Sequence, residues 1–196
     1  LELEVYNDDA VTDTDNRTIT ISAPSCKFEY RRQITIDHNQ VVGESGDSVD
    51  LTNFPILVHL TSSWLRTTTA DPTNGRIEHD QGWDIVFRDD GEDGGDQIFH
   101  EIHFYDGGAG AGEYWAWVKV PTLKATANTI IYMDYGNSCI DSDTQNAAQV
   151  WSGYQAVLHL QESGNGSDDE YTDSTGNGYD GTGGGVGDRV QVGRDV

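Results

Sequence analysis

Apolar and polar residues alternate along a series of short segments, and this period of two restricts most of the chain to β-strands. In residues 54–60, for example, Phe54, Ile56 and Val58 fall on one face of a strand. Pro55 places this segment at a sheet edge or a strand entry, because proline cannot donate a ladder hydrogen bond. The segments with strand character are residues 17–21, 33–37, 54–60, 83–87, 99–105, 114–120, 129–135 and 155–160.

Clusters of glycine, aspartate and asparagine separate these segments and predict turns. A short helix is expected only within residues 142–150, with Ser142 or Asp143 as its cap. About eight strands without a long helix indicate an all-β fold, an antiparallel β-sandwich of the jelly-roll type. The terminal segments 1–5 and 190–196 are also predicted to be extended strands.

The two cysteines flank predicted strands. Cys26 lies just before one strand and Cys139 just after another, so they become neighbours if these two strands pair antiparallel. A disulfide closing so long a loop stabilises a fold by about 4–5 kcal/mol in the chain-entropy model, and it requires an oxidising compartment. Two buried free thiols are the alternative.

The charge balance excludes some partners. With 34 acidic and 11 basic residues the formal net charge is −23, which repels nucleic-acid phosphates and anionic membranes. No apolar run approaches the roughly 20 residues that a membrane-spanning helix needs. The first residues, beginning at Leu1, carry no signal-peptide pattern, so we expect a mature or partial product.

Acidic clusters predict two candidate calcium sites, because carboxylate and backbone oxygens are the ligands that this cation prefers. The first is a loop that contains Asp89, Asp90, Glu92, Asp93 and Asp96. The second consists of Asp168, Asp169, Asp173, Asn177 and Asp180. Full solvation of these carboxylates, without any metal ion, is the alternative at both places.

Two tryptophans are candidates for ligand or partner binding. Trp115 and Trp117 share one face of the segment 114–120, and small or aliphatic residues dominate the other face. If the second face lies in the core, both indoles point outwards. There they can stack on a sugar, enter a partner subunit, or be covered by a loop of the same chain.

No residue pattern predicts catalysis. His100 and His103 are three apart on a strand and therefore point to opposite faces, so they cannot chelate one metal ion. Glu101 and His103 share a face, which allows a base and its orienting carboxylate, although a cross-strand surface pair is the commoner arrangement. We therefore expect that this protein is not an enzyme.

Five segments in order carry a family resemblance: YRRQITI at 30–36, LTNFPILV at 51–58, WDIVF at 83–87, WVKVP at 117–121 and IYMDYGN at 131–137. Together they resemble the bacterial and archaeal domain of unknown function numbered 2341. Further on, VLHLQE at 157–162 and DSTGNGYDGT at 173–182 are similar to the opening of a concanavalin-like laminin-G jelly roll. These resemblances imply a module of large surface or secreted proteins, without established catalytic residues.

The predicted organisation is an N-terminal strand extension over 1–25, a β-sandwich domain over 26–162, and a third part over 163–196. This third part is either a Gly- and Asp-rich extension or the truncated start of a second β-domain. The predicted function is a non-enzymatic extracellular or cell-surface building block, which forms a filament, pilus-like fibre or surface assembly with itself by strand exchange. The alternative is a carbohydrate-binding or adhesion module of a larger secreted protein, with glycans or neighbouring domains as partners and calcium as the candidate cofactor.

Overall fold

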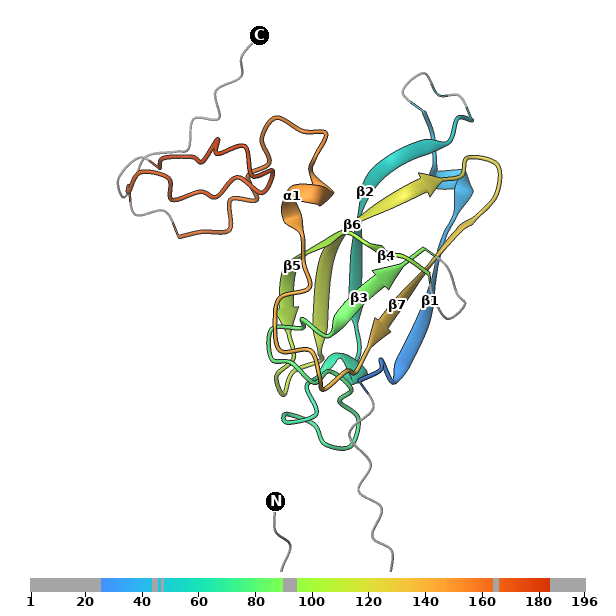
Figure 1. The fold of residues 1–196 in the computed structure, drawn as a ribbon, viewed down its shortest axis with the longest axis vertical. Helices are drawn as coiled ribbons and strands as arrows, with labels where there is room; N and C mark the ends of the chain where they lie inside the picture. The colour runs from blue at the N-terminus through green and yellow to red at the C-terminus, as the bar shows by residue number, and fades with distance from the viewer. Residues whose placement is uncertain (1–25, 44–45, 47, 90–94, 164–165, 184–196) are drawn as a thin grey trace, which may run out of the picture.

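The computed structural model describes residues 26–43, 46, 48–89, 95–163 and 166–183, and its strands form two antiparallel sheets packed as a sandwich (Figure 1). The four-stranded sheet has the order β1 (Tyr30–Ile36), β7 (Thr129–Tyr135), β3 (Ile85–Arg88), β4 (Gln97–Ile98). The three-stranded sheet has the order β2 (Leu51–Thr61), β6 (Glu113–Leu123), β5 (His100–Asp106). The predicted β-sandwich is confirmed.

Helical structure in the described residues is short, as the sequence predicts. The α-helix α1 (Ala147–Val150) lies within the predicted range. Its cap, however, is Asn146, whose side chain accepts a hydrogen bond from Gln149 N, and the prediction of Ser142 or Asp143 is wrong. Two 3-10 turns complete the helical structure, η1 (His38–Gln40) and η2 (Ser63–Leu65).

Six of the predicted strands are present, and one is not. Residues 155–160 form no strand, and only an isolated bridge joins Leu158 to Asp173. The prediction for these residues is wrong because an alternating pattern supplies no partner strand by itself. The predicted strands 1–5, 17–21 and 190–196 lie outside the described residues.

The predicted disulfide is confirmed, and the pairing of β1 with β7 explains it. Tyr30 at the start of β1 lies opposite Tyr135 at the end of β7, so the residues beyond both strands meet. Cys26 and Cys139 bond there with 5.4 Å between their Cα atoms. The bond joins positions 113 residues apart and ties the described N-terminal end to the base of β7.

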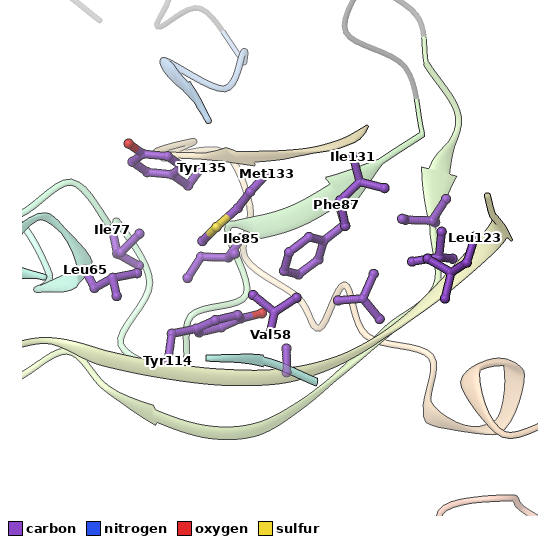
Figure 2. Close-up of a cluster of buried hydrophobic side chains, with 14 of the residues drawn as sticks. Val58, Leu65, Ile77, Ile85, Phe87, Tyr114, Leu123, Ile131, Met133 and Tyr135 are labelled. Carbon is purple, nitrogen blue, oxygen red and sulfur yellow. The ribbon is translucent and has the colours of Figure 1, made fainter. Parts of the chain in front are cut away.

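The core lies between the inner faces of the two sheets (Figure 2). β6 contributes Tyr114 and Val118, and the opposite sheet contributes Phe87 and Met133, all fully buried. Leu65 lies in the turn η2 at one end of this layer. Burial of a large aliphatic or aromatic side chain stabilises the folded state by about 1.5–3 kcal/mol each, so this layer holds the sheets together.

The chain after α1 lies beside the sandwich, in orange and red in Figure 1. Two isolated bridges organise it, from Leu158 to Asp173 and from Tyr171 to Gly181. We refer to residues 151–163 and 166–183 as the C-terminal segment. The predicted boundary near residue 163 stays a prediction.

A candidate binding face on the three-stranded sheet

The outer face of the three-stranded sheet is built by the alternation along β6. Tyr114, Ala116 and Val118 point into the core and are fully buried, so Trp115 and Trp117 point outwards as the sequence predicts. His59 and Leu57 of β2 lie opposite Trp115 and Trp117. Phe104 and Glu101 of β5 lie opposite the same two tryptophans on the other side. We call the set Leu57, His59, Phe104, Trp115 and Trp117 the outer aromatic face.

A β-bulge decides which residue of β5 joins this face. The register of β5 shifts between Ile102 and Phe104, so Phe104 lies opposite Trp115. Strict alternation from Glu101 would instead have turned Phe104 towards the core. Tyr105 then points inwards and donates from its hydroxyl to Leu65 O at 2.7 Å. The bulge leaves Phe104 47% exposed on the outer surface.

Glu113 organises the exposed part of the outer aromatic face. Its Oε1 atom accepts a hydrogen bond from Trp115 Nε1 at 2.8 Å and lies 3.0 Å from His59 Nε2. The His59 ring is stacked on the Trp115 ring with 3.8 Å between centroids. One carboxylate therefore fixes two rings against each other, and Phe104 and the 40% exposed Leu57 extend the apolar surface around them.

Trp117 is covered by the chain itself. The ring of Trp151 makes an edge contact with it at 5.2 Å, and the ring of His159 is stacked with it at 6.2 Å. Lys119, the next outward residue of β6, donates from Nζ to Gln149 O and Ser152 Oγ. The alternative of coverage by the same chain therefore holds for Trp117, whereas the ring stacked on the half-buried Trp115 is that of His59 on the neighbouring strand.

Glu101 joins the C-terminal segment to the sheet at three points. Its Oε2 atom accepts from Trp151 Nε1 at 2.5 Å and lies 3.0 Å from His159 Nε2, and its Oε1 atom accepts from Ser174 Oγ at 2.6 Å. Burial raises the pKa of this carboxyl group, but the hydrogen bonds from His159, Ser174 and Trp151 outweigh burial and lower it. Glu101 is therefore held as a carboxylate.

The groups around Glu101 are hydrogen-bonded in a different order from those of a catalytic serine site. In a Ser–His–acid triad the histidine lies between the hydroxyl and the carboxylate and takes the proton. Here the carboxylate of Glu101 lies in the middle, and it receives hydrogen bonds from both Ser174 and His159. A carboxylate of lowered pKa is a weak base towards a hydroxyl group, so the arrangement fastens the chain instead of activating Ser174.

The histidines of β5 lie on opposite faces, as their spacing predicts. His100 is fully buried in the core, where its ring meets Phe87 edge-on at 5.5 Å. His103 lies on the outside, 5.0 Å from the ring of His159 and in contact with Gln161 Nε2. The rings of His100 and His103 therefore cannot bind the same metal ion.

Asp173 of the second predicted calcium site is a hydrogen-bond hub. Its side chain is buried, and Oδ1 accepts from the backbone N–H groups of Val157 and Thr175. Its Oδ2 atom accepts from Thr175 Oγ1 at 2.6 Å and from Tyr179 N at 3.2 Å. These donors satisfy the carboxylate and close the turn around residues 173–179.

The other members of that site either have hydrogen-bond partners in the protein or are exposed. Asp180 Oδ1 accepts from Asp173 N, and Asn177 Nδ2 donates to backbone carbonyls. Asp168 and Asp169 are exposed. Across the described ranges, no group of three or more histidine, cysteine or acidic side chains is close enough to hold a metal ion. This region therefore does not assemble the predicted ligand set.

The first predicted calcium site is described only at its ends. Asp89 and Asp96 are joined by a backbone hydrogen bond from Asp89 N to Asp96 O at 3.3 Å. Asp90, Glu92 and Asp93 lie outside the described residues. Calcium binding by this loop stays a prediction.

Comparison with known proteins adds no relative: the sequence matches no family model, no curated protein and no solved structure. The resemblance to the domain numbered 2341 and to the laminin-G opening therefore stays a prediction. In the part of the chain that the structure describes, no helix has the length and apolar character needed to cross a bilayer. The disulfide between Cys26 and Cys139 indicates an oxidising compartment.

Sequence reasoning found the two tryptophans but missed their partners. Glu113 was detectable, because a carboxylate two positions before an outward tryptophan shares its face. Glu101 as an attachment point was not detectable, because its partners lie 50, 58 and 73 residues further along the chain.

Proposed function

We propose that this chain is a non-enzymatic extracellular binding module whose outer aromatic face recognises carbohydrate. The observation that carries the proposal is the fixing of the Trp115 and His59 rings by Glu113 beside the exposed Phe104. Rings held in position before binding lose little conformational entropy when a ligand docks, which favours affinity.

The chemistry of this face suits a sugar. Sugar rings present C–H faces that pack on aromatic rings, and hydroxyl groups that pair with carboxylate, imidazole and amide groups at the ring edges. Trp115 and Phe104 supply the apolar surface, and Glu113 and His59 supply the polar groups near it. The net charge of −23 opposes anionic polymers, so we propose neutral glycans as the ligand class.

The test is binding of the purified chain to an array of neutral glycans, followed by calorimetry with the best ligand. Phe104→Ala removes an exposed aromatic ring of the face, and Phe54→Ala is its control because Phe54 is a comparable 41% exposed but belongs to the other side of the sheet. We expect F104A and W115A to weaken binding about tenfold or more and F54A to leave it unchanged. Absence of any neutral-glycan binding, or equal losses in F104A and F54A, would contradict the proposal.

A further inference from the structure

A groove runs along the open side of the sandwich, between the edge strands β1 and β2. β1 is the last strand of the four-stranded sheet and β2 the last strand of the three-stranded sheet, on the same side of the core. The groove has a volume of about 570 Å³. Its lining consists of Arg32, Gln33, Ile34, Leu60, Thr61, Ser62, Trp64 and Met133.

The walls of this groove suit an extended strand. Ile34 and Leu60 are half-buried on the two edge strands, and the fully buried Met133 lies at the floor. An edge strand also presents a row of backbone N–H and C=O groups that can pair with an incoming strand. Side chains at every second position of such a strand would enter the groove, while the others would face solvent.

One positively charged side chain marks the groove. Arg32 is stacked over the Trp64 ring at 4.3 Å and donates from Nε to the Tyr135 hydroxyl at 2.9 Å. Arg32 lies opposite Met133 in the pairing of β1 with β7. Met133 is buried in the core, whereas the Arg32 side chain is exposed. In a chain with a net charge of −23, a cation at this position favours an acidic occupant.

The first 25 residues, which lie outside the described residues, contain a segment with the apolar alternation that the groove walls require, and Asp13 and Asp15 precede it. In the sequence Arg17-Thr18-Ile19-Thr20-Ile21 the two isoleucines alternate with threonines, which matches one apolar and one polar face. Residues 1–25 carry six carboxylates and one arginine, so their net charge is −5. The nine residue steps from Arg17 to the anchored Cys26 span at most about 30–32 Å when extended, which reaches a neighbouring molecule that lies against this end of the sandwich.

The disulfide places the exit of this segment away from the groove of its own chain. Cys26 is bonded to Cys139, which follows β7, and Glu29 N donates to Gly136 O at 3.2 Å. The chain therefore leaves β1 on the side of β7, whereas the groove borders the opposite edge of β1. We infer that the groove between β1 and β2 accepts residues 17–21 of a second copy of this chain.

Such an exchange joins the donor segment of one copy to the groove of the next. This contact is heterologous, because different surfaces of the two copies meet, and repeated contacts of this kind produce open filaments unless the rotation closes a ring. The inference uses a different side of the sandwich from the carbohydrate proposal, so either can fail without the other.

The experiment begins with the whole 196-residue chain in sedimentation velocity over a range of concentrations. Ile19→Asp with Ile21→Asp changes the proposed buried face of the donor, and Thr18→Asp with Thr20→Asp adds the same charge to its other face. We expect concentration-dependent assembly of the wild-type chain and of T18D/T20D, and monomers for I19D/I21D. A monomeric wild-type chain, or equal assembly of both variants, would overturn the inference.

A mixing experiment separates exchange between copies from insertion within one copy. Leu60→Glu introduces a carboxylate into the groove, and circular dichroism melting checks that this variant folds. We expect L60E and I19D/I21D to be monomeric alone and to form a dimer of one copy of each when mixed, because one still has a donor and the other a groove. Failure of the mixture to dimerise would overturn exchange between copies.

A peptide test does not depend on the folding of any groove variant. A synthetic peptide of residues 15–23 is expected to bind the I19D/I21D chain and to shorten wild-type assemblies by occupying free grooves. The same peptide with Asp at positions 19 and 21 serves as its control. Equal effects of the two peptides would contradict a side-chain-specific groove.

Discussion

The carboxylate of Glu101 on β5 accepts a hydrogen bond from the indole Nε1 of Trp151 at 2.5 Å, across fifty residues of sequence. The same carboxylate is bonded to Ser174 and lies 3.0 Å from the His159 ring. One strand residue thus fixes the position of a long segment that forms no strands of its own in its described part. Trp117 is covered as a consequence, and only part of the outer aromatic face remains open.

Replacement of Glu101 tests this attachment. Glu101→Ala leaves three donors without their acceptor, and an unsatisfied buried polar group costs about 1–3 kcal/mol. We expect faster hydrogen exchange at Val157 N and Ser174 N, with amides of β6 unaffected. Hydrogen exchange with mass spectrometry measures this change.

Glu29→Ala is the control for Glu101→Ala because Glu29 is an exposed carboxylate outside the cluster. Unchanged exchange in E101A, or an equal increase in both variants, would show that Glu101 does not hold the C-terminal segment.

The lowered pKa of Asp173 predicts that the C-terminal segment becomes less stable at low pH. Burial raises the pKa of its carboxyl group, but hydrogen bonds from Thr175, Val157 and Tyr179 outweigh burial and lower it from 3.8 to about 2. A lowered folded-state pKa contributes stability above the unfolded-state value, and this stability is lost as the pH falls from about 4 to about 2. NMR spectra of the Thr175 and Tyr179 amides should change over this range.

Asp173→Asn should show the loosened state at every pH, because an NH₂ group replaces one carboxylate oxygen and cannot accept the hydrogen bonds that Thr175 Oγ1 and Tyr179 N donate to Oδ2. Asp168→Asn, at an exposed position, should behave like the wild-type chain. A wild-type segment that keeps its structure at pH 2 would contradict the assigned role of Asp173.

The lowered pKa of the buried His100 predicts that the free energy of unfolding also depends on pH in a higher pH range. Burial lowers its pKa from 6.5 to about 4, with Asp143 opposing the shift. Between these values the unfolded chain binds a proton that the folded chain does not, so stability falls as the pH decreases from about 6.5 towards 4. Urea denaturation at several pH values measures the slope.

His100→Leu removes this titrating group and should flatten the dependence between pH 6.5 and 4. His38→Leu is the control because His38 lies in the turn η1, which contains no buried residue. Identical slopes in H100L and the wild-type chain would show that other groups cause the acid sensitivity.

We expect the chain with the disulfide to be much more stable than a chain without it. Linking residues 113 positions apart restricts the unfolded chain, which corresponds to about 4–5 kcal/mol in the chain-entropy model. Cys26→Ser with Cys139→Ser should therefore lower the free energy of unfolding by about this amount in urea denaturation. Reduction of the wild-type chain should give a similar loss, and a loss below about 1 kcal/mol would contradict the prediction.

The alternation of side chains was sufficient to predict most of the strands. It placed β7 at its observed bounds and set the inward and outward faces of β6, because successive residues of any strand point to opposite sides. It also led to the disulfide, since Cys26 and Cys139 meet only if the strands beside them pair as β1 and β7 do.

Reasoning from the sequence pattern failed where the structure of a residue depends on which distant residue it contacts. Residues 155–160 alternate like a strand but pair only at Leu158, and Phe104 reaches the outer face through a bulge that has no marker in the sequence. The acidic residues of the second predicted calcium site were grouped by proximity in sequence, whereas the Asp173 carboxylate is satisfied by backbone donors.

The sequence by itself therefore determined the strand type, the facing of Trp115 and Trp117, and the possibility of the disulfide. Only the tertiary structure decided that Trp117 is covered, that Glu113 fixes Trp115 and His59, and that β1 and β2 border an open groove. The physical reason is that side-chain direction follows from local backbone geometry, whereas coverage and open edges depend on contacts between residues far apart in the chain.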